Sequence, residues 1–161
     1  MRPIQTASAL AHVWPDRKIS TVPTPLQSAP SVVNPSPIIV TTLIVPGLND
    51  DLLELNDLAA FIVQDLGPET PWHISRFHPT YKLTDRPSTP IQTLTTAREI
   101  GLNAGLRYVY TGNVPGNTAE NTFCYSCGET VIERWGFQVE NLRLKNGKCP
   151  QCGVEIDGVW E

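Results

Sequence analysis

The 161-residue sequence has few charged side chains and no long apolar run, and each shortage excludes a class of protein. Charged residues make up only 17%, and the net charge of −4 opposes binding to nucleic acid or to an anionic membrane surface. No run approaches the roughly 20 apolar residues of a membrane-spanning helix. The N-terminus also lacks the basic start and apolar core of a secretory signal. We therefore expect a soluble, cytoplasmic protein with no nucleic-acid or membrane partner.

Three common catalytic patterns are missing as well. The chain has no GxSxG, no GxGxxG after a predicted strand and no GxxxxGK. A hydrolase with a serine nucleophile elbow, a dinucleotide-binding unit and a phosphate-binding loop of the usual kinds are therefore not indicated.

Residues 1–37 differ in composition from the rest of the chain. They hold seven of the fifteen prolines, among Ser, Thr and Ala, as in "TVPTPLQSAPSVVNPSP". Each proline removes an amide donor and fixes φ, so neither a helix nor a central strand can run through this stretch. The composition predicts a disordered or extended proline-rich arm over residues 1–37.

The pattern changes at residue 38, where strand and helix signals begin to alternate. The unbroken apolar run "PIIVTTLIVPG" predicts a strand buried on both faces of a parallel sheet. A helix capped by Asn49 or Asp50 follows and ends at Gly67, and "WHISRF" predicts the next strand. Thr89 is expected to cap a second helix, which ends at Gly105 before the strand "LRYVYT".

Strand, helix, strand, helix and strand in succession predict an α/β fold with about three parallel strands and two helices over residues 38–118. Three strands cannot close a barrel, and an open parallel sheet leaves long edges exposed. The sheet is therefore expected either to find a partner at an exposed edge or to be only marginally stable.

All four cysteines fall in two CxxC pairs with the spacing C-x2-C-x21-C-x2-C: Cys124, Cys127, Cys149 and Cys152. In a reducing compartment this spacing indicates a metal site rather than disulfides. Four thiolates form a closed tetrahedral shell that suits one structural zinc ion, although iron fits the same ligands. We expect a zinc ribbon over residues 119–161, with a turn at Asn146-Gly147 and a third strand in "VEIDGVW". Six acidic and four basic residues from Cys124 onward argue against nucleic-acid binding there.

Several strings occur together along the chain: "TTLIVPGLND", "PWHISRFHPTYKL", "AREIGLNAGLRYVYTGNVPG", "CYSCG" and "CPQCGVEIDGVW". From about residue 38 to residue 161 the sequence resembles the C-terminal half of radical S-adenosylmethionine (SAM) enzymes of the AmmeMemoRadiSam system. These are relatives of the pyruvate formate-lyase activating enzymes. The resemblance implies a partial (β/α) barrel fragment followed by a four-cysteine zinc ribbon.

In that family a four-iron, four-sulfur cluster on a CxxxCxxC motif cleaves SAM to a 5′-deoxyadenosyl radical. The 161 residues contain no CxxxCxxC, so the ligands of the cluster are absent. The resemblance therefore implies a truncated or split radical SAM protein that binds metal but is inactive alone. Its expected partner is a separately encoded N-terminal half that carries the cluster.

Three residues are assigned to SAM binding by resemblance: Arg76, His78 and Asn113. A histidine at the end of the sixth barrel strand lies against the adenosine of SAM in the activating enzymes, and His78 falls at the matching place. Arg76 and His78 also lie at the carboxyl end of a predicted parallel strand, where α/β sheets gather ligands. On residue chemistry alone, a loop histidine fixed by Pro79 is the favoured interpretation of His78, and only the resemblance reverses this. Asn113 is equally a turn former.

Two further expectations concern packing. His73 is predicted to be a core histidine with its hydrogen bonds satisfied, and Trp72, Trp135 and Trp160 are predicted to pack in the core or the ribbon. No catalytic residue is assigned. The alternative function, from another class, is a non-catalytic zinc-ribbon module that binds a protein partner.

Overall fold

The computed structural model describes residues 38–160, so the predicted proline-rich arm lies outside the described residues. Its first layer is a parallel sheet of β1 (Val40–Ile44), β2 (Trp72–Arg76) and β3 (Val109–Gly112), in the order β1-β2-β3. In the register of this sheet Thr41 lies beside His73, which lies beside Tyr110. The prediction of three parallel strands is confirmed.

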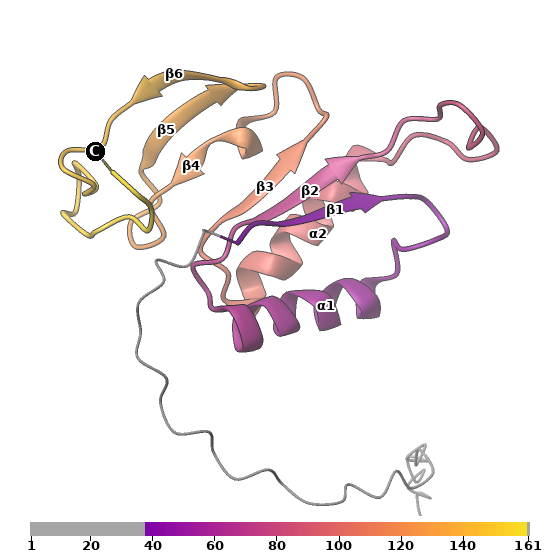
Figure 1. Ribbon diagram of the computed structural model, residues 1–161, viewed down its shortest axis with the longest axis horizontal. Coiled ribbons are helices and arrows are strands. Elements are labelled where there is room, and N and C mark those ends of the chain that lie inside the picture. The colour runs from indigo at the N-terminus through magenta and orange to yellow at the C-terminus, as the bar shows by residue number, and fades with distance from the viewer. Residues whose placement is uncertain (1–37, 161) are drawn as a thin grey trace, which may run out of the picture. The chain divides into compact units, whose positions relative to one another are not determined.

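Two helices connect the strands and pack on the same face of the sheet (Figure 1). The first, α1 (Leu52–Phe61), continues into one wider π-helical turn, η1 (Ile62–Leu66), and the second is α2 (Ile91–Ala104). The fully buried Trp72 lies at the centre of this helix–sheet core. Other residues of the core come from both helices and from all three strands: Ile44, Leu55, Ala59, Ile62, Ile74, Leu94, Ala97 and Val109.

Within residues 38–160 no helix packs on the opposite face of the sheet, and there the prediction that β1 is buried on both faces is wrong. Val40 and Ile44 face the helices, whereas Leu43 on the other face is 46% exposed and the neighbouring Ile39 is 56% exposed. Alternate residues of a strand point to opposite faces, so Thr41, Leu43, His73, Ser75, Tyr110 and Gly112 belong to the second face. We call these six residues the open face.

Both predicted helix caps are also wrong. The Oδ1 atom of Asp51 caps α1 by accepting hydrogen bonds from the backbone N–H groups of Leu53 and Glu54, at 2.8 and 3.3 Å. Thr89 makes no cap on α2. It is fully buried, donates its hydroxyl to the carbonyl of Ile44 at 2.6 Å, and accepts from the N–H of Phe77 at 2.9 Å. Thr89 therefore ties the start of α2 to β1 and to the end of β2.

A second, antiparallel sheet follows β3 and consists of β4 (Thr122–Phe123), β5 (Thr130–Trp135) and β6 (Gln138–Leu142). A short 3-10 turn, η2 (Thr118–Glu120), leads into β4. The sequence pattern predicted a strand of this sheet in residues 154–160, after the second CxxC pair, and this prediction is wrong. That segment makes only an isolated bridge between Glu155 and Lys148, and the additional strand is β4, which precedes the first CxxC pair. The Asn146-Gly147 turn is confirmed by positive φ at both residues.

The second sheet has a small core of its own, and one strand of the parallel sheet contributes to it. Buried residues of this core are Tyr108, Cys124, Val131, Ile132, Cys149 and Ile156. Tyr110, from the open face, packs against it. Between residues 38 and 160 no helix is long and apolar enough to cross a membrane.

Candidate metal centre and ligand sites

The two CxxC pairs are about 25 positions apart in the sequence, but their four sulfur atoms cluster together in the structure. The sulfur atoms of Cys124, Cys127, Cys149 and Cys152 all lie within 4.8 Å of one another. Cys124 Sγ is 3.6 Å from Cys152 Sγ, and Cys127 Sγ is 3.7 Å from Cys149 Sγ. A tetrahedron with zinc–sulfur bonds of about 2.3 Å has sulfur–sulfur edges of roughly 3.8 Å. The cluster therefore has the size of a tetrahedral metal site, and its sulfurs are too far apart for disulfides.

The two CxxC loops have the same backbone conformation. In each, the glycine after the second cysteine donates its N–H to the carbonyl of the first, Gly128 to Cys124 at 2.8 Å and Gly153 to Cys149 at 2.9 Å. Both glycines have positive φ, 76° and 77°, which other residues rarely adopt. The first cysteine of each pair is buried and the second is exposed. The two loops are thus equivalent halves of one site.

The backbone around Cys149 favours the thiolate that a metal needs. Burial would raise the pKa of this thiol, but the N–H groups of Cys152 and Gln151 and the thiols of Cys127 and Cys124 lower it to about 7. Metals bind the thiolate and not the thiol, so binding releases protons. Four thiolates at these distances would repel one another, and a divalent cation bound among them would offset that repulsion.

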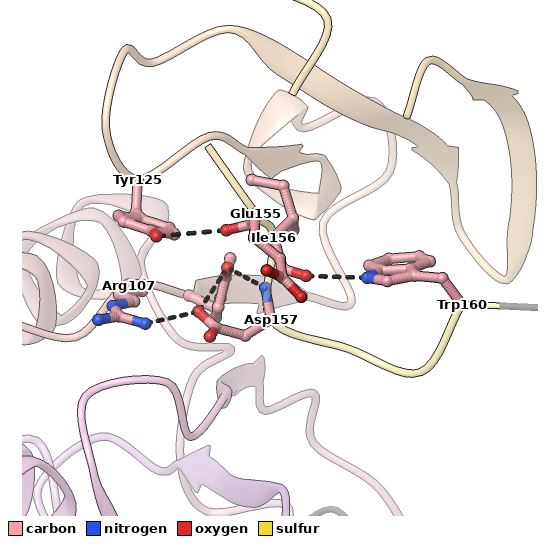
Figure 2. A network of polar contacts seen from close by, with 7 residues as sticks. Arg107, Tyr125, Glu155, Ile156, Asp157 and Trp160 are labelled. Carbon is pink, nitrogen blue, oxygen red and sulfur yellow. Dashed lines mark hydrogen bonds and ion pairs between the residues drawn. The ribbon is translucent and has the colours of Figure 1, made fainter. Parts of the chain in front are cut away.

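A polar network joins this centre to the start of β3 (Figure 2). The carboxylate of Asp157 accepts from Arg107 Nη1 at 2.8 Å and from the Tyr108 hydroxyl at 3.0 Å, and its backbone N–H donates to the same hydroxyl at 3.1 Å. The Arg107 guanidinium also lies 4.4 Å from the ring centre of Tyr125, which sits between the first two cysteines. The Tyr125 hydroxyl donates to the carbonyl of Glu155. The second CxxC loop is therefore held to the parallel sheet through Asp157.

The residues assigned to SAM by resemblance meet at the carboxyl edge of the parallel sheet. Asn113 donates its Nδ2 to the backbone carbonyl of Arg76 at 3.1 Å, and its own carbonyl lies 3.4 Å from His78 Nε2. A carbonyl can only accept, so His78 Nε2 is the donor to Asn113, and His78 Nδ1 lies 3.3 Å from the Ser88 hydroxyl. The Arg76 guanidinium turns away and donates through Nε to the carbonyl of Thr89 at 2.8 Å. His78 and Asn113 are thus brought together, and Arg76 joins them through its backbone.

Comparison with known proteins gives one relative of uncharacterized function. The chain is 51% identical over 120 residues to the uncharacterized protein MJ0808 of Methanocaldococcus jannaschii. This match takes in 73% of the chain and 36% of the relative, so the chain spans about a third of the length of the curated relative it matches. No family model and no solved structure matches the chain.

A cavity of about 760 Å³ lies on the open face, and no motif or spacing in the chain predicted it. His73 lines this cavity instead of the core, half-buried and stacked on Tyr110 at 4.7 Å between ring centres, so its assignment as a core histidine is wrong. Trp135 is 60% exposed at the cavity rather than packed in the ribbon. Trp72 is in the core as predicted, and Trp160 packs against Gly147 with its Nε1 donating to the carbonyl of Ile156. Aromatic residues on both sides of the glycine in "WGF" were the one local signal of an exposed hairpin tip.

Proposed function

We propose that this chain is the C-terminal part of a radical SAM protein of the AmmeMemoRadiSam type, which binds a structural metal and is inactive alone. One observation carries the proposal beyond the sequence strings. The strands run in the order β1-β2-β3, and both connecting helices pack on one face of the sheet. That arrangement is typical of a (β/α) barrel, whereas doubly wound sheets carry helices on both faces and reverse their strand order.

The chemistry of the open face supports the same proposal. A (β/α) barrel turns its helix-free face inward and gathers its ligands at the carboxyl ends of its strands. Polar and aromatic side chains lie there, including His73, Ser75 and Tyr110, and Leu43 on β1 remains exposed. In the proposed barrel the missing strands would pair along β1 and cover this face. A cluster-bearing N-terminal half is accordingly the partner that we propose.

We further propose that the four cysteines hold one zinc ion and that residues 119–161 form a zinc ribbon. A closed shell of four thiolates leaves no open position for water or substrate, so the ion would be structural and not catalytic. Its function would be to fix the second sheet against β3. Iron in the same four thiolates is the competing assignment, and metal analysis separates the two.

At the carboxyl edge, we propose that His78 lies against the adenosine of SAM and that Asn113 positions it. The hydrogen bonds with Ser88 and Asn113 orient the His78 ring, which is the preorganisation that a binding residue needs. The Arg76 guanidinium would support this edge without contacting SAM, since its Nε donates a hydrogen bond to the carbonyl of Thr89. The edge supplies one side of a pocket only, so SAM affinity of the lone chain would be weak.

The experiment that tests the proposal measures 5′-deoxyadenosine release with SAM and a reductant. The chain alone should release none above background, because it carries no ligands for the cluster. Adding a separately expressed half with CxxxCxxC should produce cleavage, which His78→Ala should reduce and Lys82→Ala, an exposed neighbour, should not. Release by the lone chain would refute the inactive-fragment proposal.

A non-catalytic module that binds a protein partner is the second candidate. It is favoured by exposed apolar side chains near β1 and at the β5–β6 turn, where Ile38 is 57% exposed and Phe137 fully so. If no cluster-bearing half pairs with the chain, and a protein partner is lost when Phe137→Ser is introduced, this candidate replaces the first.

A further inference from the structure

The cavity on the open face has the size and the walls of a small-molecule site. Its volume of about 760 Å³ lies within the range of roughly 300–1,000 Å³ that ligand pockets occupy. Its floor is the sheet, through His73, Ser75 and Tyr110, and its wall is the turn that joins β5 to β6. Asn113 is the one residue that the cavity shares with the proposed SAM edge.

Aromatic rings line two sides of the cavity. On the floor, the rings of His73 and Tyr110 stack with an interplanar angle of 29°. On the wall, Trp135 is 60% exposed and Phe137 is fully exposed. The Tyr110 hydroxyl is hydrogen-bonded to Thr122 at 3.0 Å and its ring stacks on His73, so the floor is held in place. The exposed rings of Trp135 and Phe137 are then the ones available to stack on a planar ligand.

One cationic side chain in the cavity has no carboxylate partner. Among the described residues 38–160, Arg107 and Arg143 form ion pairs, whereas Arg134 forms none. The acidic residue that lines the cavity, Glu120, is occupied by the N–H of Gly136 at 2.9 Å. Burial, and then the charge of Arg134, hold the pKa of His73 below its usual value, so this imidazole is neutral at pH 7 and Arg134 is the positively charged side chain of the lining. A guanidinium binds a carboxylate or a phosphate through paired hydrogen bonds.

We propose that this cavity binds a small planar ligand that carries an anionic group, with Arg134 holding the anion and Trp135 stacking on the ring. The anion is a carboxylate or a phosphate, since a guanidinium fork fits both. The site is built from this chain's own residues and requires neither His78 nor a second half of a barrel, so its test on the lone chain does not depend on SAM cleavage.

The proposal is tested on the zinc-loaded full chain with two matched pairs of probes, followed by shifts of ¹⁵N-labelled amides and of the Trp135 indole N–H. AMP is compared with adenosine, and indole-3-acetate with indole-3-ethanol. At least one charged probe should shift Ser75, Gly112 and Trp135 saturably, and its uncharged counterpart should bind at least about tenfold more weakly. Binding of AMP assigns a phosphate, and binding of indole-3-acetate assigns a carboxylate.

Variants separate the site from general electrostatics. Arg134→Gln should weaken the charged probe at least about tenfold and leave the uncharged one unchanged, and Arg134→Lys should fall between. Arg143→Gln is the matched control and should have no effect, because Arg143 is an exposed arginine just after β6 that is paired with Glu129 and Glu133. Spectra of the free variants that match wild type away from the cavity verify folding. The proposal is overturned if neither charged probe gives saturable shifts up to about 10 mM, or if Arg134→Gln and Arg134→Lys both bind as wild type does.

Discussion

Replacing Cys149 by serine should unfold the second sheet while the helix–sheet core stays folded. Cys149 supplies one of the four sulfurs and is itself buried in the core of the second sheet, at 2% exposure. A serine hydroxyl does not ionise near neutral pH, and its oxygen lies closer to the backbone than the sulfur did. The variant therefore loses the fourth ligand and the closed shell together.

The size of the effect follows from how little apolar surface the second sheet buries. Its core has three aliphatic side chains with almost no exposure, Val131, Ile132 and Ile156. Each contributes about 1.5–3 kcal/mol, so together they stay below about 10 kcal/mol. Structural zinc contributes on the order of 10 kcal/mol or more, which is at least as much as these three side chains together. Loss of the metal therefore removes the largest single contribution to the stability of the second sheet.

The assay is amide hydrogen exchange on wild type and variant. The N–H of Arg143, which donates to the carbonyl of Val131 at 3.0 Å, should lose its protection, as should other amides of β5 and β6. Amides of β2, around the fully buried Trp72, should keep most of theirs, because that core is made by other residues. Gln151→Ser, an exposed position between the second pair of cysteines, is the control and should exchange as wild type does. If Cys149→Ser retained equimolar metal and the wild-type melting temperature, the four-ligand account would be refuted.

Three more outcomes are expected. The purified chain should contain one zinc ion and no colour, and stoichiometric iron with visible absorption would show that the zinc assignment is wrong. Asp157→Ala should lower stability by about 1–2 kcal/mol, since it removes the carboxylate that joins the second CxxC loop to β3 but lies at a partly exposed site. Glu155→Ala, which leaves the backbone carbonyl of that residue in place, should change the melting temperature little by comparison. Gly101→Ala should destabilise the chain by about 1–3 kcal/mol despite the better helix propensity of alanine, because the added Cβ would lie 2.9 Å from the Trp72 ring. Asn103→Ala, at an exposed position of the same helix, should be neutral or slightly stabilising in thermal unfolding, and equal melting temperatures for both alanine variants would contradict the packing argument.

The sequence by itself determined the features that depend on neighbouring residues. A CxxC pair followed by glycine fixes two thiols on one tight loop, and two such pairs need only one contact to complete the site, so the four cysteines were identified without a structure. The alternation of strand and helix patterns gave three strands and two helices for the same reason. Gly67 and Gly105 end their helices with the positive φ that only glycine adopts easily.

Tertiary structure decided which face of each strand is covered and which distant side chains meet. An apolar run reads the same whether one face or both are buried, so the open face of β1 was not predictable from "PIIVTTLIVPG". Thr89 resembles a helix cap in sequence, but the partner of its hydroxyl is the carbonyl of Ile44, 45 positions away. The cavity likewise joins His73 of one sheet to Arg134 and Trp135 of the other, and no local pattern encodes that encounter. Packing between elements sets such contacts, because it depends on the register of whole sheets and not on the spacing of adjacent residues.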